Sequence, residues 1–280
     1  MARIAKKATI IAKKSTIFFA LSYFFINVAA KIGKKMKYAI IAAGEGSRLA
    51  AEGIELPKPL VEVDGKALID RLIGIFMDNG AEEIVVICND MTTLVPRHLI
   101  DIQRDGLKGR PIPLRFVVKS TPSSMHSFHE ISQYLTDGTF CLTTVDTIFR
   151  EEEFKAYVEE LQRMTDEGEA DGLMGVTDYI DDEKPLYVDV DEDMTVKGFL
   201  DKSDSCRFIS GGIYGLTPKA IDTLNGCMER GESRMRNFQR ALIKDGLNLK
   251  AYKFSKVLDI DHKSDIAKAE EFLISTDFHR

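Results

Sequence analysis

The chain has 280 residues, of which 44% are apolar, and a formal net charge of −6. This length and apolar content are sufficient for one well-packed domain of ordinary size, which we expect in preference to two small ones. Residues 1–35 contain eight Lys or Arg and no acid, so residues 36–280 carry a net charge of −14, which argues against general nucleic-acid binding.

The first 35 residues have the composition of a leader. A basic start is followed by the apolar and aromatic stretch STIFFALSYFFINVAA (residues 15–30) and a second basic cluster, the layout of a signal peptide or short anchor. The apolar stretch is shorter than the roughly 20 residues that a spanning helix needs. Because Met36 directly precedes the first expected strand, we expect it to be the natural start, with the leader outside the fold. A membrane-associating segment and a cleaved signal are the alternatives, and membrane association is expected only if the leader is natural.

From Met36 onward, short apolar runs alternate with amphipathic stretches. The runs are rich in Val, Ile, Phe and Thr and too short for helices, and they indicate strands buried on both faces: residues 37–43, 82–88, 114–119 and 139–146. The stretches between them have helical spacing or helix-start signals: residues 66–80, 123–135 and 151–164. Alternation of this kind predicts an α/β fold with a doubly wound, mainly parallel mixed sheet, whose ligands bind at the carboxyl ends of the strands.

After residue 170 the pattern changes. Residues 171–179 form another expected strand, and residues 185–200 alternate around an acidic turn at Asp191–Asp193, as in a β-hairpin. The remaining expected elements are a strand at 208–217, a helix capped by Thr217 with Pro218 at its first position, a helix at 234–246, a strand at 249–254 and a helix at 264–275. We expect one domain over residues 36–280, divided into halves at 36–150 and 151–280.

The four cysteines, Cys88, Cys141, Cys206 and Cys227, are far apart in the sequence. Cys88 and Cys141 lie inside apolar runs, where a cysteine usually serves as a small buried side chain. We therefore expect no disulfide framework and no zinc site, and a reducing compartment, the cytoplasm.

The segment AIIAAGEGSRLAAEGIELPKPL (residues 39–60) joins the first strand to a glycine-bearing loop. Gly44 and Gly46 allow the backbone to turn tightly and to present amide hydrogens to a ligand, and phosphate oxygens suit such a loop. Arg48 adds a planar fork for phosphate, and Lys58 is a point charge between two prolines.

Three alternatives fit this segment less well. A dinucleotide-binding fold would have a third glycine and an acid at the end of the next strand, but position 49 is Leu and that strand ends in Cys88. A P-loop needs Gly-Lys-Ser/Thr, which is absent. Turn chemistry accounts for the glycines but not for Arg48 with a proline-bracketed lysine.

Two motifs, Ala42-Ala43-Gly44-Glu45-Gly46-Ser47-Arg48-Leu49 and Pro57-Lys58-Pro59-Leu60, carry a family resemblance. Together they resemble the nucleotidyltransferase superfamily, which includes sugar-1-phosphate nucleotidyltransferases and small cytidylyltransferases for phosphocholine and related alcohol phosphates. The resemblance extends from Met36 to about Leu273. It implies a Rossmann-like nucleotidyltransferase fold, with a nucleotide-binding half at 36–150 and a hairpin-containing, acceptor-binding half at 151–280.

The resemblance also implies roles for the motif residues. The loop residues Ala42, Ala43, Gly44, Glu45 and Gly46 would wrap the triphosphate, while Arg48 and Lys58 would stabilise charge at the α-phosphate and the departing pyrophosphate. Asp146 matches the family's Mg²⁺-binding aspartate. It directly follows a buried run, where a bound cation would compensate a carboxylate; an aspartate that only caps a helix or bonds the turn is the alternative.

A second metal ligand is implied near the end of the chain, in LDIDHKSDIAKAEEFL. The sugar nucleotidyltransferase form points to Asp259 and the cytidylyltransferase form to Asp261. We expect only one of the two to face the site and favour Asp261, with Asp265 as a first-turn acid of the last helix.

The matches for the acceptor and the base are looser. Phe199-Leu200-Asp201-Lys202 and Ser210-Gly211-Gly212-Ile213-Tyr214 resemble acceptor-binding elements and point to Lys202 and Gly212, although a solvated lysine and simple strand packing are alternatives. Arg234, Arg236 and Arg240 could reach an acceptor phosphate, but an exposed helical face is favoured. Where relatives commonly have Gly-Thr-Ala for the base, this chain has residues 120–126 with Ser123 and Ser124 at a helix start. His126 and His129 have no further ligand pattern, so zinc is not expected.

The activity implied is Mg²⁺-dependent transfer of a nucleotidyl group from an NTP to a phosphorylated small-molecule acceptor, a sugar 1-phosphate first, with release of pyrophosphate. A cytidylyltransferase for a small alcohol phosphate and a non-catalytic nucleotide-sensing subunit are the alternatives. A glycosyltransferase would favour Asp-x-Asp at the strand end, but position 144 is Thr.

Overall fold

The structure is a computed structural model that describes residues 35–275, and these residues belong to one compact unit. The prediction of a leader falls almost entirely outside the described residues. Within residues 35–275, no helix is both long and apolar enough to cross a bilayer.

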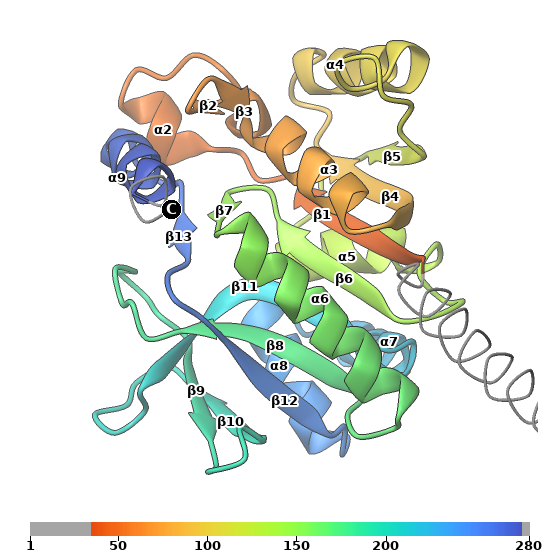
Figure 1. Ribbon diagram of the computed structural model, residues 1–280, viewed down its shortest axis with the longest axis vertical. Helices are drawn as coiled ribbons and strands as arrows, with labels where there is room; N and C mark the ends of the chain where they lie inside the picture. Colours follow the sequence, from red (N-terminus) through yellow and green to blue (C-terminus); the bar gives the residue numbers. More distant parts are fainter. Residues whose placement is uncertain (1–34, 276–280) are drawn as a thin grey trace, which may run out of the picture. The chain divides into compact units, whose positions relative to one another are not determined.

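The main sheet runs through the whole unit (Figure 1). Its strands follow the order β10-β9-β11-β6-β1-β4-β5, with β8 paired to β11 and β12 paired to β8. The strands are β1 (Met36–Ala42), β4 (Ala81–Cys88), β5 (Leu114–Val118), β6 (Phe140–Thr144), β8 (Gly172–Thr177), β9 (Tyr187–Val190), β10 (Val196–Leu200), β11 (Phe208–Leu216) and β12 (Leu249–Phe254).

Strand direction divides the sheet into two parts. The strands β6, β1, β4 and β5 pair in parallel, whereas β11 is antiparallel to β6, β8 and β9. The strands β9 and β10 form the hairpin expected around Asp191–Asp193. Along β11 the register shifts between Ser210 and Ile213, where two glycines form a bulge. The predicted α/β fold with a mixed sheet and a hairpin in its second half is confirmed.

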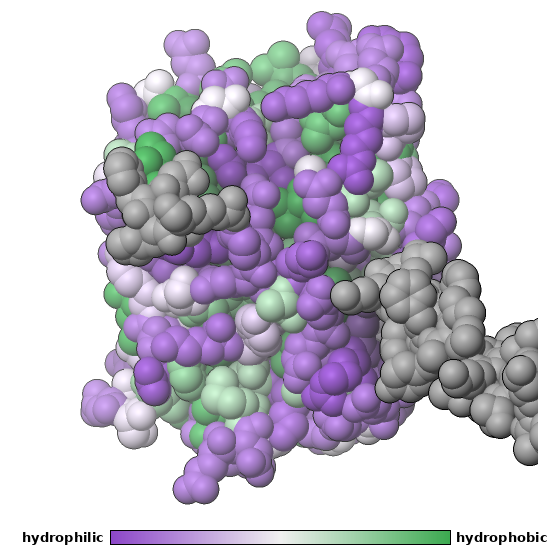
Figure 2. Space-filling model, in the orientation of Figure 1, coloured by the Kyte–Doolittle hydropathy of each residue, from purple (hydrophilic) through white to green (hydrophobic). Residues whose placement is uncertain are grey.

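Helices cover both faces of the sheet because its central strands are apolar on both sides. Along β1, Tyr38 and Ile40 join one buried cluster and Ala39 and Ile41 the other, as alternating side chains must. The first cluster is covered by α3 (Leu68–Asp78), α4 (Leu94–Asp105), α6 (Glu151–Asp166) and α9 (Lys263–Ile274); the second is covered by α5 (Ser124–Ser132), α7 (Lys219–Glu229) and α8 (Met235–Lys244). Most of the face in Figure 2 is hydrophilic, with apolar residues exposed in small separate areas.

Several short elements were not predicted from the sequence. They are α2 (Ser47–Ala51), the 3-10 helix η1 (Lys58–Leu60), β2 (Glu62–Val63), β3 (Lys66–Ala67), β7 (Thr147–Ile148) and β13 (Leu258–Asp259). The longer helix α4 was also missed. Because Lys66 and Ala67 pair with β2 as the strand β3, the helix α3 begins at Leu68 and not at residue 66 as predicted.

The start of α7 differs from the prediction by one residue. Its N-cap is Pro218, which already has helical backbone angles, and no side chain caps it. The prediction that Thr217 caps this helix is therefore wrong. The Thr217 hydroxyl is buried without a hydrogen-bond partner.

Candidate functional site

Three segments meet at the carboxyl ends of the parallel strands. The strand β6 continues beside β1 through a hydrogen bond from the Val145 amide to the Ile41 carbonyl, 3.0 Å. The Ile260 amide donates to the Asp146 carbonyl at 3.1 Å, just after β13 pairs with β7. These two bonds bring the glycine loop, the end of β6 and the segment before α9 to one place, where such sheets bind ligands.

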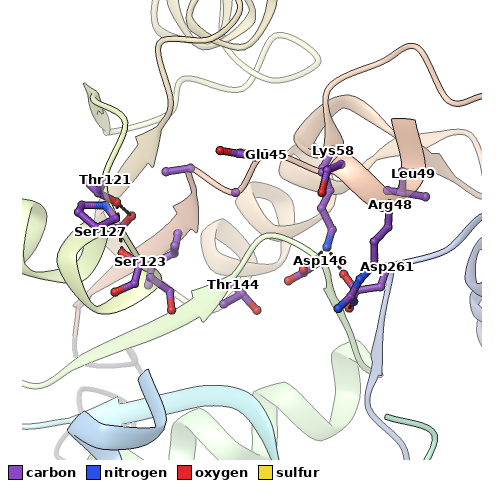
Figure 3. A pocket seen from close by; sticks show the side chains of 17 residues that line it. Glu45, Arg48, Leu49, Lys58, Thr121, Ser123, Ser127, Thr144, Asp146 and Asp261 are labelled. Carbon is purple, nitrogen blue, oxygen red and sulfur yellow. Dashed lines mark hydrogen bonds and ion pairs between the residues drawn. The ribbon is translucent and has the colours of Figure 1, made fainter. Parts of the chain in front are cut away.

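A cleft of about 510 Å³ opens at this place (Figure 3). Its lining comes from all three segments and from the start of α5. The lining residues are Ile41, Ala43, Gly44, Glu45, Gly46, Ser47, Arg48, Leu49, Lys58, Thr121, Pro122, Ser123, Ser124, Ser127, Thr144, Asp146 and Asp261. Of the predicted loop residues only Ala42, inside β1, does not line it.

Four charged side chains gather at one end of this cleft. The Lys58 ammonium donates to the carboxylates of Asp146 and Asp261, with 2.7 Å to Asp261 Oδ1. Arg48 Nη1 donates to the other Asp261 oxygen, Oδ2, also at 2.7 Å. Burial alone would lower the pKa of Lys58, but the negative charge of Asp146, followed by that of Asp261, raises the pKa to about 12. The site therefore holds a permanent cation between two carboxylates.

The glycine loop lies beside this charged group. The amides of Gly44, Glu45 and Gly46 donate no hydrogen bond within the described part of the chain. Asn89 Nδ2 donates to the Gly44 carbonyl at 3.1 Å, and this hydrogen bond holds the loop to the residue that follows β4. Gly44 has open space where a Cβ would be, so a ligand can approach its backbone closely.

Gly46 is required for a different reason. It has a φ of 64°, in the left-handed region, and a Cβ there would lie 3.1 Å from the Lys58 Cβ. Gly46 therefore allows the chain to pass directly beside the backbone of Lys58.

Hydroxyl groups line the other end of the cleft, where Figure 3 shows Thr121, Ser123 and Ser127 away from the charged group. Thr121 and Ser127 are joined through their hydroxyl oxygens at 2.6 Å, and Ser123 Oγ lies 2.8 Å from His126 Nδ1. The Ser123 hydroxyl does not cap α5, although Ser123 is its N-cap residue. In residues 35–275 no group of three or more His, Cys, Asp or Glu is arranged to hold a metal.

Among the lining residues that were not predicted as site residues, Thr144 and Ser127 had a signal in the sequence. Thr144 lies two positions before Asp146, so the two share a side of an extended chain. Ser127 follows Ser123 by four positions, one helical turn later. The hydrogen bond between the hydroxyl oxygens of Thr144 and Thr147, 2.7 Å, fixes the end of β6.

A second cleft, of about 250 Å³, adjoins the first and shares Arg48 and Asp261 with it. Most of its other lining comes from the second half of the chain, including Tyr179, Ser210 and Gly211. The second cleft therefore continues from the charged group toward that half of the chain.

Asp259 and Asp261 both line the second cleft, whereas only Asp261 lines the first. Asp261 is the residue that was favoured from the sequence to face the site. Both aspartates line the second cleft because residues two apart in an extended segment share a side, and the buried Ile260 lies between them. The Asp259 side chain is exposed to solvent at its surface. Desolvation of its carboxyl group by the surrounding protein raises the pKa of Asp259, and the negative charges of Asp146 and Asp261 raise it further. Asp265 lies in the first turn of α9 in a capping box, as predicted.

The predicted acceptor residues, Lys202 and Gly212, line neither cleft. Lys202 is exposed. Gly212 has a φ of 70° in the β11 bulge, and a Cβ there would lie 3.1 Å from Thr147 Oγ1 and 3.3 Å from Thr144 Oγ1. Asp201 pairs with Arg236 at 2.5 Å and with Arg240 at 2.8 Å, so these arginines bind a hairpin residue.

Comparison with known proteins gives matches over nearly all of the described chain. A protein family described as "Nucleotidyl transferase" matches residues 37–276. A UTP–glucose-1-phosphate uridylyltransferase of Haloferax volcanii is 25% identical over 246 residues, 85% of this chain and 96% of the relative.

Two solved structures share the fold. The inositol-1-phosphate CTP transferase from T. maritima has a TM-score of 0.67 and 20% identity, over 86% of this chain and 98% of the other. The CTP:phosphocholine cytidylyltransferase from Streptococcus pneumoniae has a TM-score of 0.66 and 18% identity, over 85% and 99%. The arrangement of sheet and helices is therefore shared by proteins whose nucleotides and acceptors differ.

Proposed function

Because the chain belongs to the nucleotidyl transferase family, we propose that it transfers a nucleotidyl group from an NTP to a phosphorylated small-molecule acceptor, a sugar 1-phosphate first. The products are an NDP-sugar and pyrophosphate. The observation that carries the proposal is the convergence of Arg48, Lys58, Asp146 and Asp261 beside the unbonded amides of the glycine loop. The Haloferax relative, a glucose-1-phosphate uridylyltransferase, supports a sugar 1-phosphate as the first acceptor to test.

In the proposed reaction an acceptor phosphate oxygen attacks the α-phosphorus of the NTP. The new bond joins that oxygen to the α-phosphorus, the bond to the bridging oxygen of the β-phosphate breaks, and pyrophosphate leaves with the electron pair. Both reactants are anions, so neutralising charge and aligning the groups provide most of the rate, and no proton transfer is needed. Lys58 and Arg48 supply positive charge, and the amides of Gly44 and Gly46 hold the phosphates. Ser123 and Ser124 would contact the base at the hydroxyl-lined end.

Mg²⁺ fits this donor set. It is usually bound through one or two carboxylates together with substrate phosphates, and Asp146 and Asp261 supply two carboxylates at the charged group. When bound, the ion would neutralise charge on the phosphates. Asp259, on the side of the second cleft, is the alternative second ligand.

A small alcohol phosphate is a second candidate acceptor. In the element that resembles a sugar-binding motif, Asp201 is paired with Arg236 and Arg240, and Lys202 lines neither cleft. These positions therefore lack free groups directed at a sugar. We also propose a cytoplasmic location, supported by the four free cysteines.

Pyrophosphate release tests the proposal. Purified chain with Mg²⁺ is combined with each of UTP, CTP, dTTP, ATP and GTP, and with glucose 1-phosphate or phosphocholine. We expect one pairing to dominate, and Asp146→Asn to lower its turnover about a hundredfold or more. Asp137→Asn is the matched control, because Asp137 also pairs with a lysine, Lys37, at 2.8 Å, at the opposite end of β1. Near-normal turnover by Asp146→Asn would show that the metal is misplaced, and no release with any pairing would contradict the activity.

A further inference from the structure

Lys58 occupies the position between the two carboxylates that would bind the metal. Its ammonium contacts Asp146 and Asp261 together, and its side chain is only 10% exposed. Arg48 donates a hydrogen bond to the other carboxylate oxygen of Asp261. Both carboxylates therefore already have cationic partners before any ligand enters the site.

We propose that Lys58 keeps the nucleotide-free enzyme from binding a divalent ion, so that the ion enters only together with the triphosphate. This inference rests on the proposed function. When the triphosphate binds, its oxygens accept hydrogen bonds from the Lys58 ammonium. The carboxylates of Asp146 and Asp261 are then free to bind the metal.

Charge balance supports this order. The two carboxylates and the two cations, Lys58 and Arg48, cancel in the ligand-free site. A free divalent ion would add positive charge beside a largely buried ammonium, which is unfavourable where screening by water is weak. A triphosphate brings enough negative charge to accommodate both the ion and the two side chains.

The chain geometry allows the exchange without movement of the backbone. Lys58 begins the 3-10 helix η1, where the Leu60 amide donates to the Pro57 carbonyl at 2.8 Å and the Val61 amide to the Lys58 carbonyl at 3.1 Å. The flanking prolines restrict the backbone further. Only the four-carbon stem of the lysine has to rotate, and lysine stems are flexible. Lys58 would therefore have two positions, one bound to the carboxylates before the nucleotide enters and one bound to phosphate afterwards.

The test measures binding of Mn²⁺ alone, without nucleotide, to the full-length chain by electron paramagnetic resonance. We expect weak binding to the wild type that does not depend on Asp146. Lys58→Met and Lys58→Gln should bind Mn²⁺ at least about tenfold tighter, equivalent to about 1.4 kcal/mol. The control is Lys219→Met, which removes a lysine paired with a single carboxylate, Asp171, at 2.7 Å. It should bind like the wild type.

Thermal unfolding gives a second measurement if the Lys58 variants are less stable. Added Mg²⁺ should raise the melting temperature of Lys58→Met and leave that of the wild type unchanged, because a ligand of the native state alone stabilises it. Equal Mn²⁺ affinity of Lys58→Met and wild type would overturn the inference. So would tight binding by the wild type that Asp146→Asn abolishes, a result that does not depend on the Lys58 variants folding. Either outcome leaves pyrophosphate release by the wild type intact, so the two proposals fail separately.

Discussion

Replacing Gly46 by alanine tests whether the glycine loop positions Lys58. The backbone at Gly46 has a φ of 64°, and an alanine in the left-handed region costs roughly 1–2 kcal/mol. In addition, the new Cβ would lie 3.1 Å from the Lys58 Cβ and 3.7 Å from the Lys58 backbone nitrogen. One of the two segments must therefore move by a few tenths of an ångström.

Gly53→Ala is the matched control for this variant. Gly53 also has a left-handed φ, 85°, but nothing lies within 4 Å of the position of its Cβ. The backbone strain that both variants share corresponds, for a domain of this size, to a loss of about 2–8 °C in melting temperature. Only Gly46→Ala should displace the Lys58 ammonium from its carboxylates.

The assay is steady-state pyrophosphate release with the best NTP and acceptor. Because small misplacements of a charged group can cost up to about a hundredfold, we expect kcat of Gly46→Ala to fall about ten- to a hundredfold. Gly53→Ala should keep kcat within about twofold of the wild type. Equal kcat values for the two alanine variants would refute the reasoning, because strain alone would then account for the effect of Gly46.

Three further predictions concern the metal, the core and a titrating pair. Removing divalent ions with EDTA should abolish pyrophosphate release, and added Mg²⁺ should restore it. Gly215→Ala should destabilise the chain by about 1–3 kcal/mol in thermal unfolding, because its Cβ would lie 2.5 Å from Leu161 Cδ2, whereas Gly198→Ala meets no such contact. The hydrogen bond to Asp70 raises the pKa of His98, so its stabilisation is complete below about pH 6.5 and is lost as the pH rises through the folded-state pKa. The difference in melting temperature between wild type and His98→Gln should therefore be larger at about pH 6 than at about pH 9; an equal difference would contradict it.

The central strands were predictable because each is short, apolar on both sides and bounded by turn residues. The helix α4 was missed although a signal was present. Val95, Leu99 and Ile102 have helical spacing and are all buried, and Pro96 is tolerated in the first turn of a helix. The proline and the many polar residues hid this pattern.

The shortest elements depend on contacts that the local sequence does not contain. The five residues of α2 are too few for a periodic pattern. Just after α2, Glu52 lies 2.7 Å from His262 Nδ1 and accepts a bond from the Lys263 amide at 2.6 Å. Both partners lie more than 200 positions away in the sequence, so tertiary structure fixes the end of this helix.

The sequence predicted which residues form the charged group but not which of them pair with one another. Motifs indicated Arg48, Lys58, Asp146 and Asp261 as separate candidates. That Lys58 bridges the two aspartates follows from the pairing of β13 with β7, two strands of two residues each that no propensity rule identifies. Sequence reasoning therefore provides the chemistry of this site, whereas the long-range pairing provides its electrostatics.

The departures from the family pattern in the second half are connected to one another. The resemblance noted in the sequence leads one to expect a glutamate at the position of Asp201, and here the shorter acid is bound by Arg236 and Arg240 of α8. Arg240 also donates to the Phe199 carbonyl at 3.0 Å, so the two arginines tie the β9–β10 hairpin to the helix. A carboxylate held by two guanidinium groups is not free to receive a substrate hydroxyl. We therefore expect selection of the acceptor to depend on side chains of the second cleft, which is lined in part by Arg48 and Asp261, where the proposed reaction places the α-phosphate.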